Sequence, residues 1–165
     1  MVLFSSSLNN DTQRYTFVDV HAYSKMDNYK NIDEQLLLAY QRTTYRLKET
    51  EIVIRIDTLN SDLDSFLIDN NAFSWVFISA DNPQSKRVLP AQNEAFRKVF
   101  LNHCKKQKWA IWPGIGIPST DDWPAEESWL ILDIDQTIGD ALAVQFDQKA
   151  YLWGWINGKA QLRIL

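Results

Sequence analysis

The sequence predicts a single α/β (α+β layered) domain, in which one mixed β-sheet of about five or six strands packs against about four helices. Short β-branched or aromatic segments alternate along the chain with segments whose apolar residues recur every three or four positions, as in strands followed by amphipathic helices. The chain closes with apolar segments at residues 150–155 and 160–165, and Asn157-Gly158 between them favours a C-terminal β-hairpin. Because a hairpin is antiparallel and helical crossovers join parallel strands, we expect a mixed sheet.

Length and composition narrow the class of protein. A chain of 165 residues, 45% of them hydrophobic and 13% aromatic, can bury a core of its own and is not mainly disordered. The formal net charge of −4 argues against a nucleic-acid-binding protein, whose footprint is basic. The chain has a single cysteine, no apolar run long enough to span a membrane, and no signal peptide in residues 1–10. We therefore expect a cytoplasmic domain that does not contact a membrane.

The chain is expected to divide into an N-terminal arm or edge strand at residues 1–30 and a single α/β domain at residues 31–165. Within the arm, Tyr15–Val20 has the composition of a strand. The domain is expected to begin with a helix, capped by Asn31 or Asp33. The apolar face of this helix is predicted from residues at helical spacing, namely Leu36, Tyr40, Thr43 and Leu47.

Local signals place the remaining elements. Asn60 or Ser61 can start a helix that ends near residue 70, and Asp135 can cap another. Pro90 suits the first turn of a long helix that continues to about residue 107. Besides the closing hairpin, strands are expected at residues 51–56, 73–79, 109–112 and 128–134, and a glycine- and proline-rich loop at 113–118.

Several segments together resemble a known family. They are Ala39-Tyr40, Thr43–Arg46, residues 51–56, Phe77–Pro83 with Ser85 and Asn93, Gly114 and Gly116, Trp123-Pro124 before Glu126–Ser128, and Phe146–Ala150 before the hairpin. In this order, over roughly residues 36–165, they resemble the DUF3293 family. The resemblance implies a small bacterial cytosolic domain, and it carries no catalytic residue because the function of the family is unknown. Asp147, where a small residue is expected, and a slightly elaborated loop after Gly116 depart from the pattern.

Polar residues that follow or precede the predicted strands form the first candidate site. An apolar strand ends at residue 79, and small and polar side chains follow it, as at the rim of a sheet where ligands bind. We expect a pocket for a small polar molecule, lined by Asn82, Ser85, Asn93, Trp123, Glu126, Ser128 and Gln148. Glu126 is its titratable group, since a carboxylate beside an indole can have a raised pKa. The alternative is that these residues only hold turns together, as Asn82-Pro83 often does.

The second candidate site is the closing hairpin. Trp153 and Trp155 alternate along a strand and therefore share one face, which suits a protein partner or a homodimer if nothing covers it. The favoured hypothesis is a non-catalytic interaction or accessory domain on this surface, because it requires the fewest coincidences. A small-molecule-binding domain or enzyme is the alternative, and a nuclease using Asp57, Asp133 and Glu126 comes third. Two histidines cannot build a His-rich metal site, and neither a metal nor a cofactor is expected.

Overall fold

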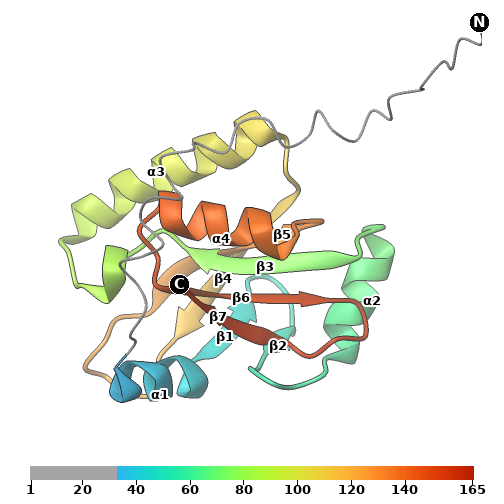
Figure 1. Ribbon diagram of the computed structural model, residues 1–165, viewed down its shortest axis with the longest axis horizontal. Helices are drawn as coiled ribbons and strands as arrows, with labels where there is room; N and C mark the ends of the chain where they lie inside the picture. Colours follow the sequence, from blue (N-terminus) through green and yellow to red (C-terminus); the bar gives the residue numbers. More distant parts are fainter. Residues whose placement is uncertain (1–32) are drawn as a thin grey trace, which may run out of the picture.

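The computed structural model describes residues 33–165, so the predicted arm at residues 1–30, with Tyr15–Val20, lies outside the described part (Figure 1). The elements, in chain order, are α1 (Glu34–Arg42), β1 (Thr44–Leu47), β2 (Val53–Ile54), α2 (Ser61–Asp69), β3 (Ser74–Ser79), the 3-10 turn η3 (Pro83–Ser85), α3 (Pro90–Gln107), β4 (Ile111–Ile117), β5 (Glu126–Leu132), α4 (Gln136–Gln145), β6 (Ala150–Trp155) and β7 (Gln161–Ile164). None of the described helices is long and apolar enough to cross a membrane.

The seven described strands form one sheet in the order β2-β1-β4-β5-β3-β6-β7, and every neighbouring pair is antiparallel. Three helical crossovers join described strands: β3-α3-β4 and β5-α4-β6 each skip one strand, and β2-α2-β3 skips three, so parallel strands never lie side by side. This is the split β-α-β order of ferredoxin-like folds. The layered α+β class, the single sheet, the four helices and the closing hairpin are confirmed. The sheet differs from the prediction in having seven strands and in being antiparallel throughout rather than mixed.

Helices cover the two faces of the sheet unequally. Figure 1 shows α3 and α4 together on one side, where Phe100 and Leu142 pack with buried side chains of β3 and β5. On the opposite face, Leu63 and Leu67 of α2 pack against Trp75 and other strand residues. Because α2 covers only part of this face, the remainder is left for α1 and the segments around it, and the candidate site lies there.

The helix starts follow the sequence signals. Asn60 Oδ1 accepts hydrogen bonds from the N–H groups of Asp62 and Leu63 at the start of α2. Asp135 accepts one from Ile138 N at the start of α4, and Pro90 opens α3. The side-chain oxygens of Asn60 and Asp135 satisfy N–H groups that the helix itself leaves unpaired, and Pro90 has no N–H to satisfy, so these starts depend only on nearby residues.

Several element boundaries were predicted wrongly: the strand expected at residues 51–56 is reduced to β2, and two further differences bear on the site. The first helix ends at Arg42 because the backbone of Thr43 is extended (φ −67°, ψ 140°), so Leu47 lies in a strand rather than on the helical face. The segment predicted as a loop at residues 113–118 is mostly strand, since β4 continues to Ile117. Gly114 in this strand leaves room for the ring of Phe77: a Cβ there would lie 2.5 Å from Cε2 of that ring, so the ring can lie against the backbone of β4.

Candidate functional site

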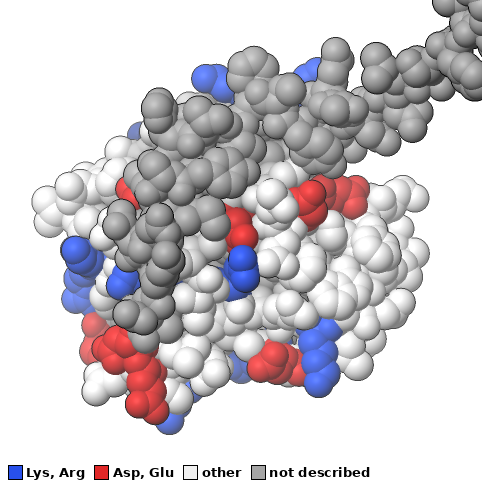
Figure 2. Space-filling view, in the orientation of Figure 1, with Lys and Arg blue, Asp and Glu red and all other residues white. Residues whose placement is uncertain are grey.

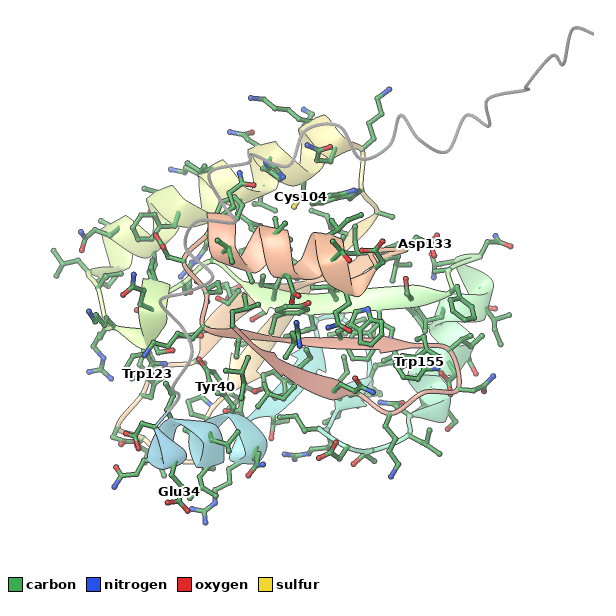
Figure 3. All side chains as sticks on the ribbon, viewed as in Figure 1. Glu34, Tyr40, Cys104, Trp123, Asp133 and Trp155 are labelled. Atoms are coloured by element: carbon green, nitrogen blue, oxygen red, sulfur yellow. The ribbon has the colours of Figure 1, made fainter. Side chains whose placement is uncertain are left out.

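A cavity of about 410 Å³ lies between α1 and the sheet face that α2 leaves uncovered. Of the seven residues predicted to line a pocket, six line this cavity: Asn82, Ser85, Trp123, Glu126, Ser128 and Gln148. Asn93 lies behind them, hydrogen-bonded to Asn82. Figure 3 shows Tyr40 of α1 and Trp123 near each other, at the end of the molecule away from Trp155.

Strand alternation explains why these side chains share one face. In β5, Glu126 and Ser128 point to the cavity side together with Leu130, whereas Glu127 between them points to the α3 side. Ser128 pairs with Ser79 of β3, and Glu126 pairs with Gly116 of β4. Because three of these four positions carry serine or glycine, the sheet leaves space beneath α1, and the carboxylate of Glu126 reaches into it.

Asn82 connects the end of β3 to the cavity. Its backbone is left-handed (φ 47°, ψ 61°), a conformation that asparagine tolerates better than most residues. Its N–H donates to Asn93 Oδ1 (2.8 Å), and its Oδ1 accepts from Asn93 Nδ2 (3.1 Å) and from Val88 N (3.2 Å). Since these two donors fix the position of Oδ1, Nδ2 must be the atom that faces Glu126.

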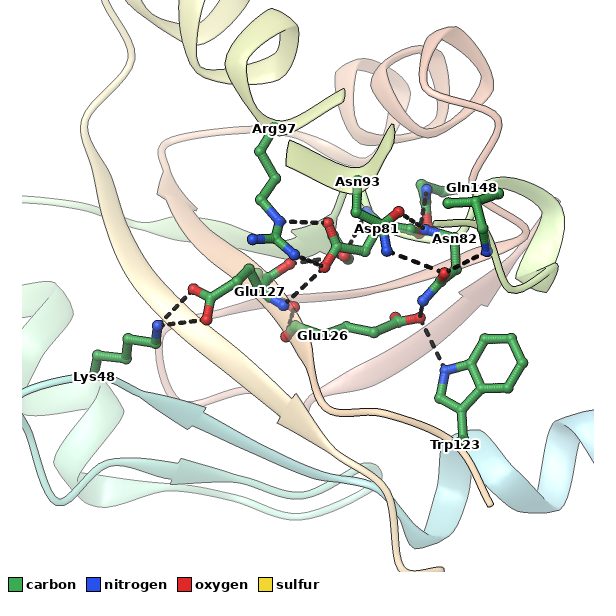
Figure 4. A network of polar contacts seen from close by, with 12 residues as sticks. Lys48, Asp81, Asn82, Asn93, Arg97, Trp123, Glu126, Glu127 and Gln148 are labelled. Carbon is green, nitrogen blue, oxygen red and sulfur yellow. Dashed lines mark hydrogen bonds and ion pairs between the residues drawn. The ribbon is translucent and has the colours of Figure 1, made fainter. Parts of the chain in front are cut away.

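The carboxylate of Glu126 is held by one of its two oxygens (Figure 4). Oε1 accepts from Asn82 Nδ2 (2.7 Å) and from the indole Nε1 of Trp123 (3.0 Å). Both groups are donors, so a proton on this carboxyl group must sit on Oε2, which has no hydrogen-bond partner among residues 33–165. Burial raises the pKa of Glu126, and the charge of Asp81 adds to the rise, while the bonds from Asn82 and Trp123 oppose it.

The two acids beside Glu126 are neutralised, and Glu126 is not. The carboxylate of Asp81, which is only 2% exposed, accepts hydrogen bonds from Nε (2.7 Å) and Nη2 (2.8 Å) of Arg97. Glu127 forms an ion pair with Lys48. No Lys, Arg or His in the described part of the chain forms an ion pair with Glu126. A carboxylate in this position gains most from a positive charge supplied from outside the protein.

The other side of the cavity is closed by residues that the sequence did not mark as functional. Tyr40 OH and Ser85 Oγ are 2.7 Å apart, and Tyr45 OH donates to Tyr40 O (2.9 Å). Burial is the main reason why the pKa of Tyr40 is raised to about 12. The sequence puts Tyr40 on the predicted face of the first helix, and its place among the family-like residues is the one sequence signal of another role.

Gln148 contributes an acceptor to the cavity. Its Nε2 donates to Asp81 O (3.2 Å) and to Phe146 O (3.3 Å). Both partners are carbonyl oxygens, so the atom facing them must be the nitrogen, and Oε1 remains as an acceptor. No hydrogen bond to this Oε1 comes from the described residues.

The remaining candidates lie elsewhere. Trp153 packs against the core beneath α3 and α4, and its ring centroid is 5.0 Å from that of Trp155, which is half-buried. Neither Asp57 nor Asp133 lines the cavity; Asp133 follows the end of β5 and accepts from Phe73 N, whereas Glu126 begins that strand. The described residues contain no group of three or more His, Cys, Asp or Glu able to hold a metal ion.

Figure 2 shows no large patch of a single charge among the described residues visible on this face. There the charged side chains of the described residues form small clusters of mixed sign, separated by wide uncharged areas. Such a distribution is ordinary for a solvated surface.

The fold and the site together define a class: an α+β domain with a ferredoxin-like strand order, extended at both edges, and a cavity whose polar end is centred on one carboxylate. Residues 78–151 match the family described as "Protein of unknown function (DUF3293)". This is the family that the sequence was expected to resemble, and the match covers this stretch. The stretch contains all seven predicted pocket residues, while α1 lies outside it. Searches of the curated proteins and of the solved structures found no significant match.

Proposed function

We propose that this domain binds a small polar molecule in the cavity between α1 and the sheet, and that Glu126 recognises it. The observation that carries the proposal is the carboxylate of Glu126, which is held through Oε1 while Oε2 is left without a protein partner in residues 33–165. A cavity of about 410 Å³ is within the range of small-molecule sites.

A purely structural role explains this arrangement less well. A glutamine at position 126 would accept the same two hydrogen bonds without placing a charge in a poorly solvated site. A glutamic acid in this position has a raised pKa, and its charged form lowers the stability of the domain. Such a cost is typical of residues that serve binding or catalysis. The three positive-φ residues at the rim, Asn82, Gln84 and Ser85, are consistent with this, because strained backbone tends to gather at functional sites.

We also propose that the domain works in the cytoplasm of a bacterium, as the family resemblance implies. The lone Cys104 supports this location: it is buried, and the chain cannot form an internal disulfide.

The test is a ligand-observed NMR screen of a small-molecule library against the full chain, with Gly116→Leu as the blocking variant. A Cβ at Gly116 would meet only ordinary contacts of 3.8 to 3.9 Å, so a leucine can extend into the cavity without backbone strain. We expect hits that Gly116→Leu abolishes at unchanged thermal stability. A screen without hits, or hits that persist in the variant, would contradict the proposal.

The interaction module remains a second candidate. It is favoured by the half-buried Trp155 in the closing hairpin, whose second strand, β7, is one of the two edge strands of the described sheet. An edge strand offers unpaired backbone groups to another chain. Light scattering after gel filtration tests it: the hypothesis predicts a dimer that Trp155→Ala converts to monomer, and a monomer at all concentrations contradicts self-association.

A further inference from the structure

We propose that the ligand of this cavity carries a single ammonium group on a largely apolar body, with the ammonium bound to Oε2 of Glu126. This inference rests on the proposed function and adds the chemical class of the ligand. It depends on the charge balance of the cavity, the number of free acceptors and the composition of the walls.

The charge balance favours a cation. Glu126 is the only carboxylate among the lining residues that is not exposed; the other charged lining residues, Arg42 and Asp122, are both exposed. An anionic ligand would bring a like charge to a carboxylate that is already poorly solvated, and a neutral one would leave it without a counter-charge. Protonation of Glu126 would remove the charge too, and an ammonium ligand competes with that proton for Oε2.

The geometry favours an ammonium over a guanidinium. A guanidinium binds a carboxylate best through two parallel N–H bonds, one to each oxygen. Oε1 of Glu126 already accepts from Asn82 and Trp123, so both of its lone pairs are in use. Only Oε2 is left, and a compact group that concentrates its charge at one point suits a single oxygen.

An ammonium group also has N–H groups to spare, and the cavity supplies further acceptors. Gln148 Oε1 is one, for the reason given above. Ser128 Oγ is another, because it donates to Glu126 O and keeps its lone pairs. These groups and Oε2 of Glu126 give three acceptors for the three N–H bonds of a primary ammonium.

The rest of the lining suits a hydrocarbon body. Apolar side chains come from α1, β3, β6 and β7: Leu36, Leu38, Phe77, Leu152 and Leu162. Tyr40, Tyr45 and Trp123 add aromatic surface, which attracts cations as well as apolar groups. We therefore expect the charged end of the ligand at Glu126 and its carbon skeleton along α1 and the sheet.

The experiment titrates the full ¹⁵N-labelled chain near neutral pH with four probes that share a benzene ring. Benzylammonium has a single charged nitrogen, benzamidinium a planar two-donor fork, benzyl alcohol no charge and benzoate a negative charge. The reporter is the indole N–H signal of Trp123, which is hydrogen-bonded to Glu126 and can be assigned from the spectrum of Trp123→Phe. Glu126→Gln, which can keep both bonds to its Oε1, is the matched control.

We expect benzylammonium to shift this signal with an affinity about tenfold or more above that of each other probe, since a hydrogen bond to a charged group is worth about 1.5–3 kcal/mol. Glu126→Gln should abolish the preference. Equal binding of benzyl alcohol, or tighter binding of benzoate or benzamidinium, would overturn the ammonium assignment and leave the proposed function standing. If no probe shifts the signal, the screen decides: neutral or anionic hits refute only the ligand class, whereas no hits at all refute both proposals.

Discussion

Arg97→Met should destabilise the domain strongly, because it removes the cation that faces the buried carboxylate of Asp81. That carboxylate is 2% exposed, and Arg97 contacts both of its oxygens, at 2.7 and 2.8 Å. Asp81 lies two residues after the end of β3, and its Oδ2 also accepts from Glu127 N at 3.3 Å. Methionine keeps much of the length of the arginine stem, so the change removes the charge and the hydrogen bonds more than the packing.

The size of the effect follows from the burial of the two partners. Breaking a buried pair by deleting one ion costs about 3–5 kcal/mol, because the other charge stays buried without a partner. Arg97 has 31% of its side chain exposed, and water therefore screens its half of the pair. We expect a loss at the lower end of this range, about 3 kcal/mol. This is a large part of the total free energy of unfolding of a domain, which is roughly 5–15 kcal/mol.

Urea denaturation followed by tryptophan fluorescence measures the change in the free energy of unfolding. Lys98→Met is the matched control: Lys98 is the next residue of α3 and pairs with Glu94, but the two side chains are 71% and 61% exposed. This control should unfold at nearly the same urea concentration as the unmodified protein. The double variant Asp81→Asn/Arg97→Met should recover part of the loss, because no charge then remains buried.

The reasoning would be refuted if Arg97→Met cost no more than Lys98→Met, or if the double variant were less stable than Arg97→Met alone. Either result would mean that the carboxylate of Asp81 is solvated, or paired in another way, in the folded protein.

Three further predictions concern single positions. Because the folded-state pKa of Glu126 lies above the ordinary 4.5, the folded state holds its proton more tightly than the unfolded state, and stability falls as pH rises from 4.5 through the folded-state value. Glu126→Gln should therefore have a higher Tm than the unmodified protein above this window and a similar one below it, and equal Tm values throughout would contradict the prediction. Gly114→Ala should cost about 1–3 kcal/mol in urea denaturation because its Cβ would lie 2.5 Å from the ring of Phe77, whereas Gly116→Ala should cost little; equal losses would be contrary to this geometry. Cys104 is 0% exposed and burial raises its pKa to about 12, so it should react with a thiol reagent only when the protein unfolds, and fast labelling of the folded chain would disprove this.

The sequence was most informative where structure depends on neighbouring residues. The helix start at Asn60 needs only the N–H groups two and three residues on, and Pro90 opens α3 because an N–H is not needed there. The spacing of Thr43 and Leu47 misled because Leu47 satisfies two periods at once, four residues from Thr43 in a helix and two from Tyr45 in a strand. Pairing of β1 with β4 decided for the strand, and no local signal records that pairing.

The candidate site could likewise be predicted from the sequence only in part. Its polar residues could be predicted because they lie at the ends of strands. Polar side chains that follow an apolar run there indicate the rim of a β-sheet. The contact of α1 with this rim could not be predicted, because the hydrogen bond between Tyr40 and Ser85 joins positions 45 residues apart. The space itself depends partly on Gly116, which the sequence places in a glycine- and proline-rich loop and which only the register of β4 and β5 places beside Glu126.

The strand order also limits how the chain can be divided. Residues 78–151, which match the family, begin inside β3 and end at the second residue of β6. A fragment with these ends would lack β1, which pairs with β4, and β7, which pairs with β6. Its shortened sheet would expose two interior strands as new edges, and such edges favour aggregation. The stretch that matches the family model is therefore not a unit of folding, and any shortened version of this protein should keep β1 through β7 intact.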